Sequence, residues 1–191
     1  MHDSPRYFFP KPYADFVQRR RVAFGFTLLA AFAWFSQPSP LSLLVGVPIS
    51  LAGLLIRAWA AGHLSKNQQL ATTGPYAYMR NPLYAGTLIV ACGIVIACRS
   101  TVLAVIFLFA FVLVYLPAIE LEEQHLRELF PAYDSYAARV YRFLPLRKWP
   151  GGHASFSAAL YMRNQEYKAA LGFLIAFAWM AWKCWLSTTV R

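Results

Sequence analysis

Long apolar runs alternate with short polar segments along most of this chain. Five runs are rich in Leu, Ile, Val, Ala, Phe and Trp and hold few charged residues: 22–35, 41–61, 82–98, 101–119 and 168–186. A helix needs roughly 20 mainly apolar residues to cross the hydrocarbon core of a bilayer. The pattern therefore predicts an all-α, polytopic membrane bundle of about five transmembrane helices, in a single domain that covers residues 1–191.

The first apolar run is short for a membrane span. Basic residues at 19–21 precede it and can reach toward lipid headgroups, and local thinning of the bilayer can also supply the missing length. A re-entrant hairpin is the less favoured alternative. The second run contains Arg57 near one end, and we expect this side chain to snorkel to the interface.

The polar segments predict elements outside the bilayer. Residues 1–21 are polar and contain three prolines, which favours an extended cytoplasmic arm with at most a short interfacial helix near 13–18. Residues 120–141 alternate apolar and charged positions, which predicts an amphipathic helix at the surface or against the bundle, broken by Pro131. We expect a loop over 143–152 and another interfacial helix over 155–167.

Composition agrees with a membrane protein. The chain is 59% hydrophobic and 14% charged, more apolar than a soluble domain of 191 residues can bury. The net charge of +10 could indicate a nucleic-acid partner, but the basic residues flank apolar runs and match no nucleic-acid motif. The three cysteines lack metal-ligand spacing, so we expect neither a nucleic-acid nor a metal partner.

Lysine and arginine placement predicts the orientation. With the N-terminus taken as cytoplasmic, 14 of the 18 basic residues lie on the cytoplasmic side and three on the opposite side, and Arg57 lies within a span. An odd number of spans then places the C-terminus on the opposite side.

The segment 74–86, GPYAYMRNPLYAG, is the first candidate for chemistry. A Gly-Pro turn leaves backbone groups free at the membrane boundary, where a polar ligand could satisfy them. Its tyrosines can stack on a flat heterocycle, and Arg80 and Asn81 can bind a carboxylate or an amide-like edge. The alternative interpretation is an aromatic belt with an interfacial arginine.

The adjacent carboxylates Glu122 and Glu123 are the second candidate. Neighbours on a helix do not face the same way, so we expect one to point inward and the other outward or to an arginine. The inward carboxylate suits a cationic ligand or vicinal hydroxyls; a solvated helix start is the alternative. Arg139 and Arg142 either close a pocket over the ligand or anchor the chain to anionic lipid.

The order of these motifs resembles the isoprenylcysteine carboxyl methyltransferase family, whose relatives include phospholipid methyltransferases. The resemblance covers about residues 60–146: the segment 74–86, a span, the Glu-Glu pair, Tyr133-x-x-Tyr136, and Val140-x-Arg142-Phe143-x-Pro145. It implies S-adenosylmethionine as cofactor, bound in a pocket at the cytoplasmic boundary. The residues that it assigns to cofactor binding are Gln68, Gln69, Leu70, Ala71, Tyr76, Asn81, Pro82, Leu83, Tyr84 and Glu122.

The chain departs from the family pattern at two positions. Asn81 stands where many members have His, and it cannot titrate near neutral pH. Ala118 stands where the isoprenylcysteine enzymes have an Arg that resembles a clamp for the substrate carboxylate. The second departure weakens the case for prenylcysteine as the substrate, and the cofactor site matches the family better than the acceptor site.

The resemblance implies methyl transfer from S-adenosylmethionine to a membrane-resident small molecule or lipid, at a carboxyl, amine or hydroxyl group. No catalytic residue is assigned, because no base is obvious in the sequence. One alternative is an NADPH-dependent enzyme similar to sterol reductases. Its extra phosphate would call for a basic cluster beyond Arg80 near the loop, and the sequence shows none there. Another is a non-enzymatic small membrane protein.

Overall fold

The computed structural model describes residues 8–150, 152 and 154–189, and over these residues it is helical with no strand. The elements in chain order are α1 Lys11–Phe35, α2 Pro40–Ala61, the 3₁₀-helix η1 Gly74–Ala77, α3 Pro82–Cys98, α4 Thr101–Ala110, the π-helix η2 Phe111–Tyr115, α5 Leu116–Leu129, α6 Tyr133–Arg139, α7 Ala158–Arg163 and α8 Tyr167–Thr189.

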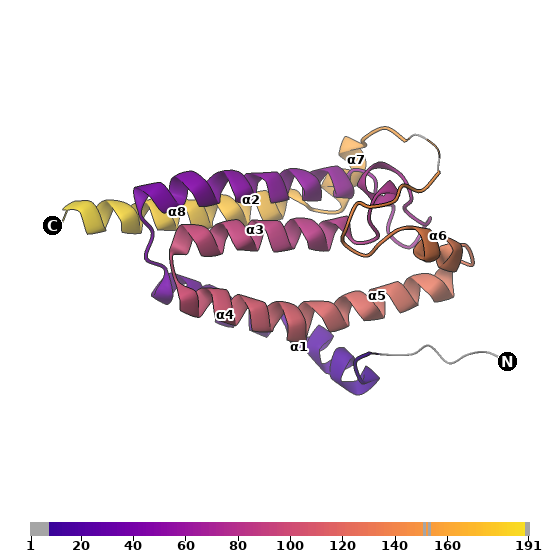
Figure 1. Ribbon diagram of the computed structural model, residues 1–191, viewed down its shortest axis with the longest axis horizontal. Coiled ribbons are helices and arrows are strands. Elements are labelled where there is room, and N and C mark those ends of the chain that lie inside the picture. Colours follow the sequence, from indigo (N-terminus) through magenta and orange to yellow (C-terminus); the bar gives the residue numbers. More distant parts are fainter. Residues whose placement is uncertain (1–7, 151, 153, 190–191) are drawn as a thin grey trace.

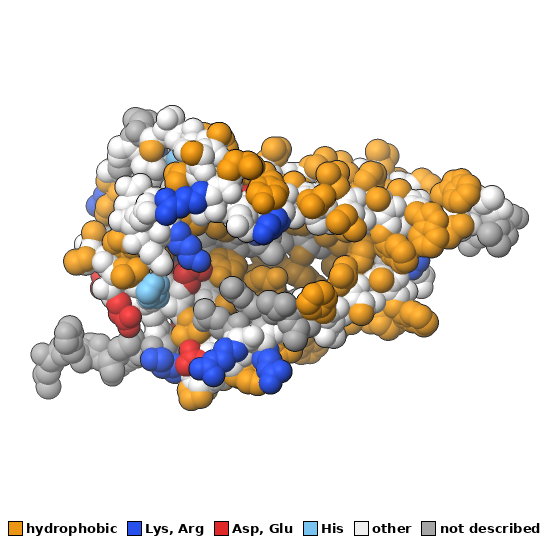
Figure 2. All heavy atoms as spheres, turned by 180° about the vertical axis from the view of Figure 1, so that it is seen from behind, with side chains coloured by type: hydrophobic (Ala, Val, Ile, Leu, Met, Phe, Trp, Pro, Cys, Tyr) orange, Lys and Arg blue, Asp and Glu red, His pale blue; other side chains and the backbone are white. Residues whose placement is uncertain are grey.

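The long helices run side by side along one axis, and the short elements gather at one end (Figure 1). We call the end formed by η1, α6 and α7 the polar end. Figure 2 shows that charged side chains collect mainly there, whereas hydrophobic side chains cover most of the rest of this face. The molecule is therefore divided into an apolar shaft and a polar cap.

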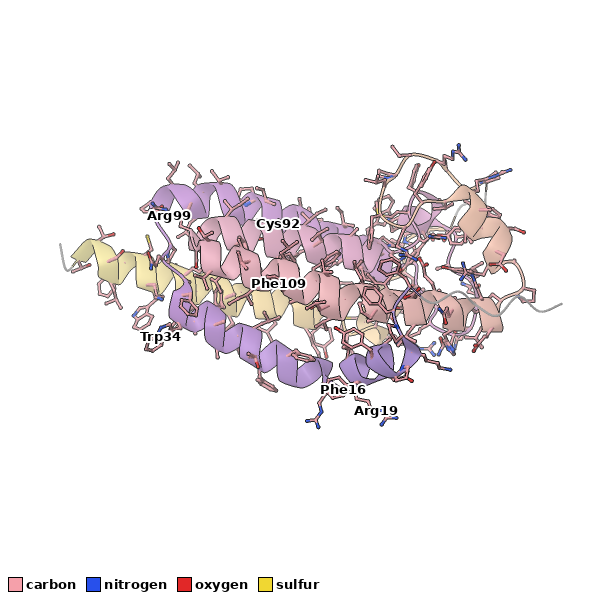
Figure 3. All side chains as sticks on the ribbon, turned by 60° about the horizontal axis from the view of Figure 1, so that its bottom comes forward. Phe16, Arg19, Trp34, Cys92, Arg99 and Phe109 are labelled. Atoms are coloured by element: carbon pink, nitrogen blue, oxygen red, sulfur yellow. The ribbon has the colours of Figure 1, made fainter. Side chains whose placement is uncertain are left out.

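The shaft has the properties of a membrane bundle. Three helices are long and apolar enough to cross a bilayer, namely Pro40–Ala61, Thr101–Leu129 and Tyr167–Thr189, and Phe24–Phe35 and Pro82–Cys98 are shorter apolar helices. Large apolar side chains on the shaft are exposed, including Trp34, which points away from the bundle at the end of α1 (Figure 3). These observations confirm the predicted helical membrane bundle, and three to five of its helices are candidates for the spans, where the sequence predicts about five.

Helices α2 and α3 pack closely because glycines face each other across their interface. A Cβ on Gly53 would lie 2.6 Å from the Val90 backbone nitrogen and 2.7 Å from the Gly86 carbonyl oxygen. The Ser50 hydroxyl donates to the Val90 carbonyl at 3.0 Å across the same contact. Small residues that let two backbones approach are typical of helix pairs in membranes.

The prediction for the N-terminal arm was wrong over residues 11–21. The structure continues one helix from Lys11 to Phe35, while residues 1–7 lie outside the described part of the chain. Pro12 lies in the first turn, where proline's missing N–H costs no hydrogen bond. The helix is continuous over 25 residues, so it is not a re-entrant hairpin, although only Phe24–Phe35 forms its apolar part.

Helix α4 continues through η2 into α5, so the amphipathic segment extends the fourth span instead of lying flat on the surface. Pro117 lacks the N–H that would bond the Leu113 carbonyl in an α-helix. The Tyr13 hydroxyl of α1 donates to that carbonyl at 2.7 Å. The predicted break at Pro131 is confirmed, because it separates α5 from α6.

Arg57 does not snorkel to the interface. Its Nε and Nη2 donate to the two carboxylate oxygens of Glu166 at 2.5 and 3.0 Å, and its Nη1 donates to Thr87. Glu166 is 8% exposed and immediately precedes α8. The ion pair therefore ties α2 to the start of α8, with α3 alongside.

The helix expected over 155–167 is shorter than predicted. α7 has six residues, and it caps the end of α2. The Asn164 amide donates to the carbonyls of Ala61 and Leu64, both at 2.9 Å. These carbonyls lie at and just beyond the end of α2, where no further helical turn can satisfy them.

Candidate cofactor site

The loop that joins α2 to α3 is held by a glycine turn. Gly74 has φ +57°, a left-handed conformation that glycine adopts without strain, and a Cβ there would lie 2.6 Å from the His63 ring. Pro75 follows in η1, and Tyr76 at its centre is 6% exposed. The Tyr136 hydroxyl of α6 donates to the Tyr76 carbonyl at 2.7 Å, which fixes the loop against the polar end.

Glu123 joins this loop to α5 and to the segment after α6. Asn81 precedes α3 at its N-cap, yet its side-chain amide donates to Glu123 at 2.8 Å instead of capping the helix. Arg142 donates to both Glu123 oxygens, at 3.2 and 2.7 Å, and Arg80 Nε lies 3.4 Å from Oε1. The bond to Glu123 raises the pKa of Arg142, so this guanidinium stays charged.

Glu122 points the other way. Its carboxylate accepts a hydrogen bond from the Tyr84 hydroxyl of α3 at 2.9 Å. The expected division of the acidic pair is therefore confirmed: one carboxylate binds arginine and the other faces a cavity. The same bond brings the two motifs of the sequence analysis into contact, although they are 38 residues apart.

A cavity of about 490 Å³ lies between the loop, α3, α5 and α6. This volume is in the usual range for a site that binds a small molecule. Nine of the ten residues that the resemblance assigned to cofactor binding line it: Gln69, Leu70, Ala71, Tyr76, Asn81, Pro82, Leu83, Tyr84 and Glu122. Gln68 does not line it, and its side chain instead accepts a hydrogen bond from the Ser65 hydroxyl at 2.7 Å.

The cavity wall carries both signs of charge and neutral hydroxyls. Asp15 and Glu122 are its acidic residues, and Lys66 and Arg80 are its basic residues. Burial raises the pKa of Tyr76 well above its ordinary value, and the nearby Glu122 raises it further. The Tyr76 phenol therefore remains protonated and serves as a donor, not a base.

One buried donor at the wall lacks a protein partner. The Tyr133 hydroxyl is buried without a hydrogen bond within the described part of the chain, and Arg80 Nε is buried with only its ion pair to Glu123 at 3.4 Å. Burial also raises the pKa of Tyr133, so its hydroxyl keeps its proton. Buried polar groups are normally satisfied, and a ligand with acceptor atoms would meet this need. The donor set thus fits a polar, zwitterionic cofactor such as S-adenosylmethionine.

Comparison with known proteins identifies the family of the chain. A profile of the phospholipid methyltransferase family matches residues 42–133. The nickel-cobalt-cadmium resistance protein NccN of Alcaligenes xylosoxydans xylosoxydans is 31% identical over 151 residues, which cover 71% of this chain and 70% of that protein. The chain belongs to the phospholipid methyltransferase family.

A second relative is the cobalt-zinc-cadmium resistance protein CzcN of Cupriavidus metallidurans. It is 35% identical over 112 residues, which cover 56% of this chain and 50% of that protein. No solved structure matches the chain. Over the described residues, no group of three or more His, Cys, Asp and Glu side chains could hold a metal ion.

Several residues of the cavity wall were not predicted from the sequence. Ala118, Leu121, Glu122 and His125 all line the cavity from α5, and only Glu122 was assigned to the cofactor. Their spacing is that of one helix face, so the assigned Glu122 could have predicted the others. Asp15 comes from α1, outside the segment that matches the family, and no local pattern marked it.

Of the two alternatives for Arg139 and Arg142, closure of the cofactor pocket is wrong, whereas anchoring to anionic lipid stays a prediction. Neither arginine lines the 490 Å³ cavity. Arg142 binds Glu123, and the Arg139 guanidinium lies over the Trp149 ring, 5.8 Å from its centroid. Both arginines line a different cavity.

Proposed function

We propose that this protein transfers a methyl group from S-adenosylmethionine to a lipid or another small molecule that resides in the membrane. The observation that carries the proposal is one cavity lined by both family motifs, which the hydrogen bond from Tyr84 to Glu122 joins. Membership of the phospholipid methyltransferase family supports membrane methyl transfer in general. The cofactor and the kind of acceptor are proposed here.

S-adenosylmethionine supplies a sulfonium-bound methyl group that is electrophilic when the cofactor is bound. The protein's part is to align an acceptor with that methyl group and to exclude water, and alignment alone can lower the barrier by about 7–11 kcal/mol. Tyr84 and Glu122 would hold the cofactor from α3 and α5. Asn81 lines the wall, but its amide donor is used by Glu123, so we assign it to positioning.

The wall residues Ala118, Leu83 and Leu121 favour a methyl acceptor other than a free carboxylate. Ala118 places a methyl group on the cavity wall. At the matching position the isoprenylcysteine enzymes have an arginine. Leu83 and Leu121 add further apolar surface, which suits a lipophilic acceptor entering from the bilayer. An amine or hydroxyl acceptor must lose a proton, and Asp15, Glu122 and His125 are the wall groups able to take it.

Calorimetric titration of the purified full chain with S-adenosylhomocysteine, the demethylated product, tests the cofactor. We expect one site, and we expect Glu122→Gln or Tyr84→Phe to weaken binding about tenfold, because each loses a hydrogen bond to a charged group. Glu128→Gln is the matched control, because Glu128 lies exposed on the same helix away from the cavity.

NADPH in a parallel titration separates the two enzyme classes. Binding of NADPH with no response to S-adenosylhomocysteine would replace the proposal with the reductase alternative. A cooperative thermal transition first verifies that the protein is folded. If neither S-adenosylhomocysteine nor NADPH then gives a heat of binding, both enzyme classes are rejected.

The names of the two relatives suggest a setting for this activity. NccN and CzcN are named for resistance to nickel, cobalt, cadmium and zinc. We propose that methylation by this chain contributes to tolerance of such metals by modifying a membrane component. Growth of a deletion strain in graded Co²⁺ and Cd²⁺, complemented by the wild type or by Glu122→Gln, tests this: only the wild type should restore tolerance.

A further inference from the structure

A second cavity opens on the outer side of the polar end, next to the cofactor site. Its volume is about 310 Å³, and it is lined by four arginines, Arg80, Arg139, Arg142 and Arg147. The lining includes no carboxylate among the described residues. Four guanidinium groups around one small hollow repel one another unless an anion lies between them.

Two of the four arginines are neutralised only in part. Glu123 is shared between Arg142 and Arg80, so one carboxylate serves two guanidinium groups. Arg142 remains 41% exposed at its side chain, which leaves it open toward the cavity. The pair with Glu123 therefore still carries one net positive charge.

The other two arginines each lie over an aromatic ring. Arg139 lies 5.8 Å from the Trp149 ring centroid, and Arg147 lies 5.6 Å from the Tyr141 centroid. A guanidinium held over an aromatic ring keeps its charge and its five N–H donors. Within the described part of the chain no hydrogen bond uses the donors of Arg139 or Arg147, so both side chains are held in place with donors open to a phosphate.

Exposed apolar side chains flank the arginines on the same segment. Tyr141, Leu144 and Leu146 are 43%, 59% and 67% exposed. Leucines that stand free beside arginines are typical of segments that lie at a membrane interface, with the apolar groups in the acyl region and the cations at the phosphates. This neighbourhood favours a phosphate carried by a lipid over a free phosphate ion.

We propose that the cavity between Arg139, Arg142 and Arg147 binds the phosphate of an anionic phospholipid. This lipid is distinct from the methyl acceptor, since these three arginines do not line the cofactor cavity. Arg80 lines both cavities, so the bound headgroup lies directly behind a wall of the cofactor site. The inference does not depend on the proposed methyl transfer, and it is tested without any methyl donor.

The test uses the purified full chain in neutral detergent with three probes: dihexanoyl phosphatidylglycerol, dihexanoyl phosphatidylcholine and inorganic phosphate. Binding is measured by thermophoresis. We expect phosphatidylglycerol to bind more tightly than either other probe. Arg139→Gln combined with Arg147→Gln should weaken its binding by about fivefold for each arginine.

The control variant is Arg19→Gln combined with Arg163→Gln, which removes two exposed arginines outside the cavity. It should bind phosphatidylglycerol like the wild type, and both double variants should keep the wild-type melting temperature. Equal losses in the two variants would show general charge attraction and overturn the site. Binding of inorganic phosphate as tight as that of phosphatidylglycerol would overturn the lipid assignment, and so would equal binding of phosphatidylcholine.

Discussion

The neighbouring residues Glu122 and Glu123 have two different roles. Successive helix residues point roughly 100° apart, so two neighbouring carboxylates cannot share an environment. Glu123 is 3% exposed and binds Asn81 and Arg142, whereas Glu122 is exposed to the cavity and accepts from Tyr84. The first carboxylate stabilises the fold of the polar end, and the second is available to a ligand.

Replacing these two residues should therefore separate stability from binding. Glu123→Gln should lower the free energy of unfolding by about 2 kcal/mol or more, because it leaves two arginines without their carboxylate; Arg142 is partly exposed, which reduces the cost. Glu122→Gln should leave the melting temperature nearly unchanged. Thermal unfolding of both variants in detergent is the measurement, and equal destabilisation would contradict the division of roles.

At the scale of elements, the contact between α2 and α3 positions the site. Gly53 and Gly86 bring the two backbones together, and the Arg57 ion pair with Glu166 adds the start of α8. α3 begins with Asn81 and Pro82, both on the cavity wall. The position of the wall thus depends on how closely α3 can lie against α2.

Adding one methyl group to a glycine should give opposite results at two helix positions. Gly53→Ala should lower the melting temperature, because its Cβ would meet the α3 backbone. Gly172→Ala in α8 meets nothing within 4 Å and should be neutral or stabilising by up to about 1 kcal/mol, since alanine favours helix. Melting curves of the two variants measure this, and a stable Gly53→Ala protein would contradict the close packing.

Helices that are marked by a local feature, such as an apolar run or a proline, could be predicted from the sequence. Apolar runs predicted three of the spans within a few residues at both ends, and Pro82 correctly marked the start of α3. The start of α1 could not be predicted because prolines in a polar segment favour an extended arm, although Pro12 suits a first helical turn.

The contacts that could not be predicted join residues that lie far apart in the sequence. The pairing of Arg57 with Glu166 joins residues 109 positions apart, and the bond from Tyr13 to Leu113 joins residues 100 apart. Asp15 reaches the cavity only because α1 packs beside α5. No spacing rule connects such positions, whereas Tyr84 and Glu122 could be linked through the family resemblance.

At the scale of the whole molecule, the polar end carries the cofactor cavity, the arginine cavity and most of the charged residues. α1 begins near this end, and α8 ends at the opposite one (Figure 1). The excess of lysine and arginine predicts that the polar end faces the cytoplasm. A cofactor made in the cytosol would then reach the cavity directly.

Labelling from one side of the membrane tests this orientation. Cys92 is the exposed native cysteine and is replaced by Ala; single cysteines are then placed at Glu128, on the polar end, and at Gln37, between α1 and α2. In intact cells, an impermeant maleimide should label Gln37→Cys alone. Labelling of Glu128→Cys before permeabilisation would show that the protein has the opposite orientation.

The central claim is that two separate segments enclose one methyl donor. Ultraviolet photolabelling of the purified full chain with methyl-tritiated S-adenosylmethionine, followed by peptide mapping, tests it most directly. We predict label in peptides covering residues 69–84 and 118–126, and loss of label in both when S-adenosylhomocysteine competes. Label confined to other peptides, or label that the competitor does not remove, would contradict the account.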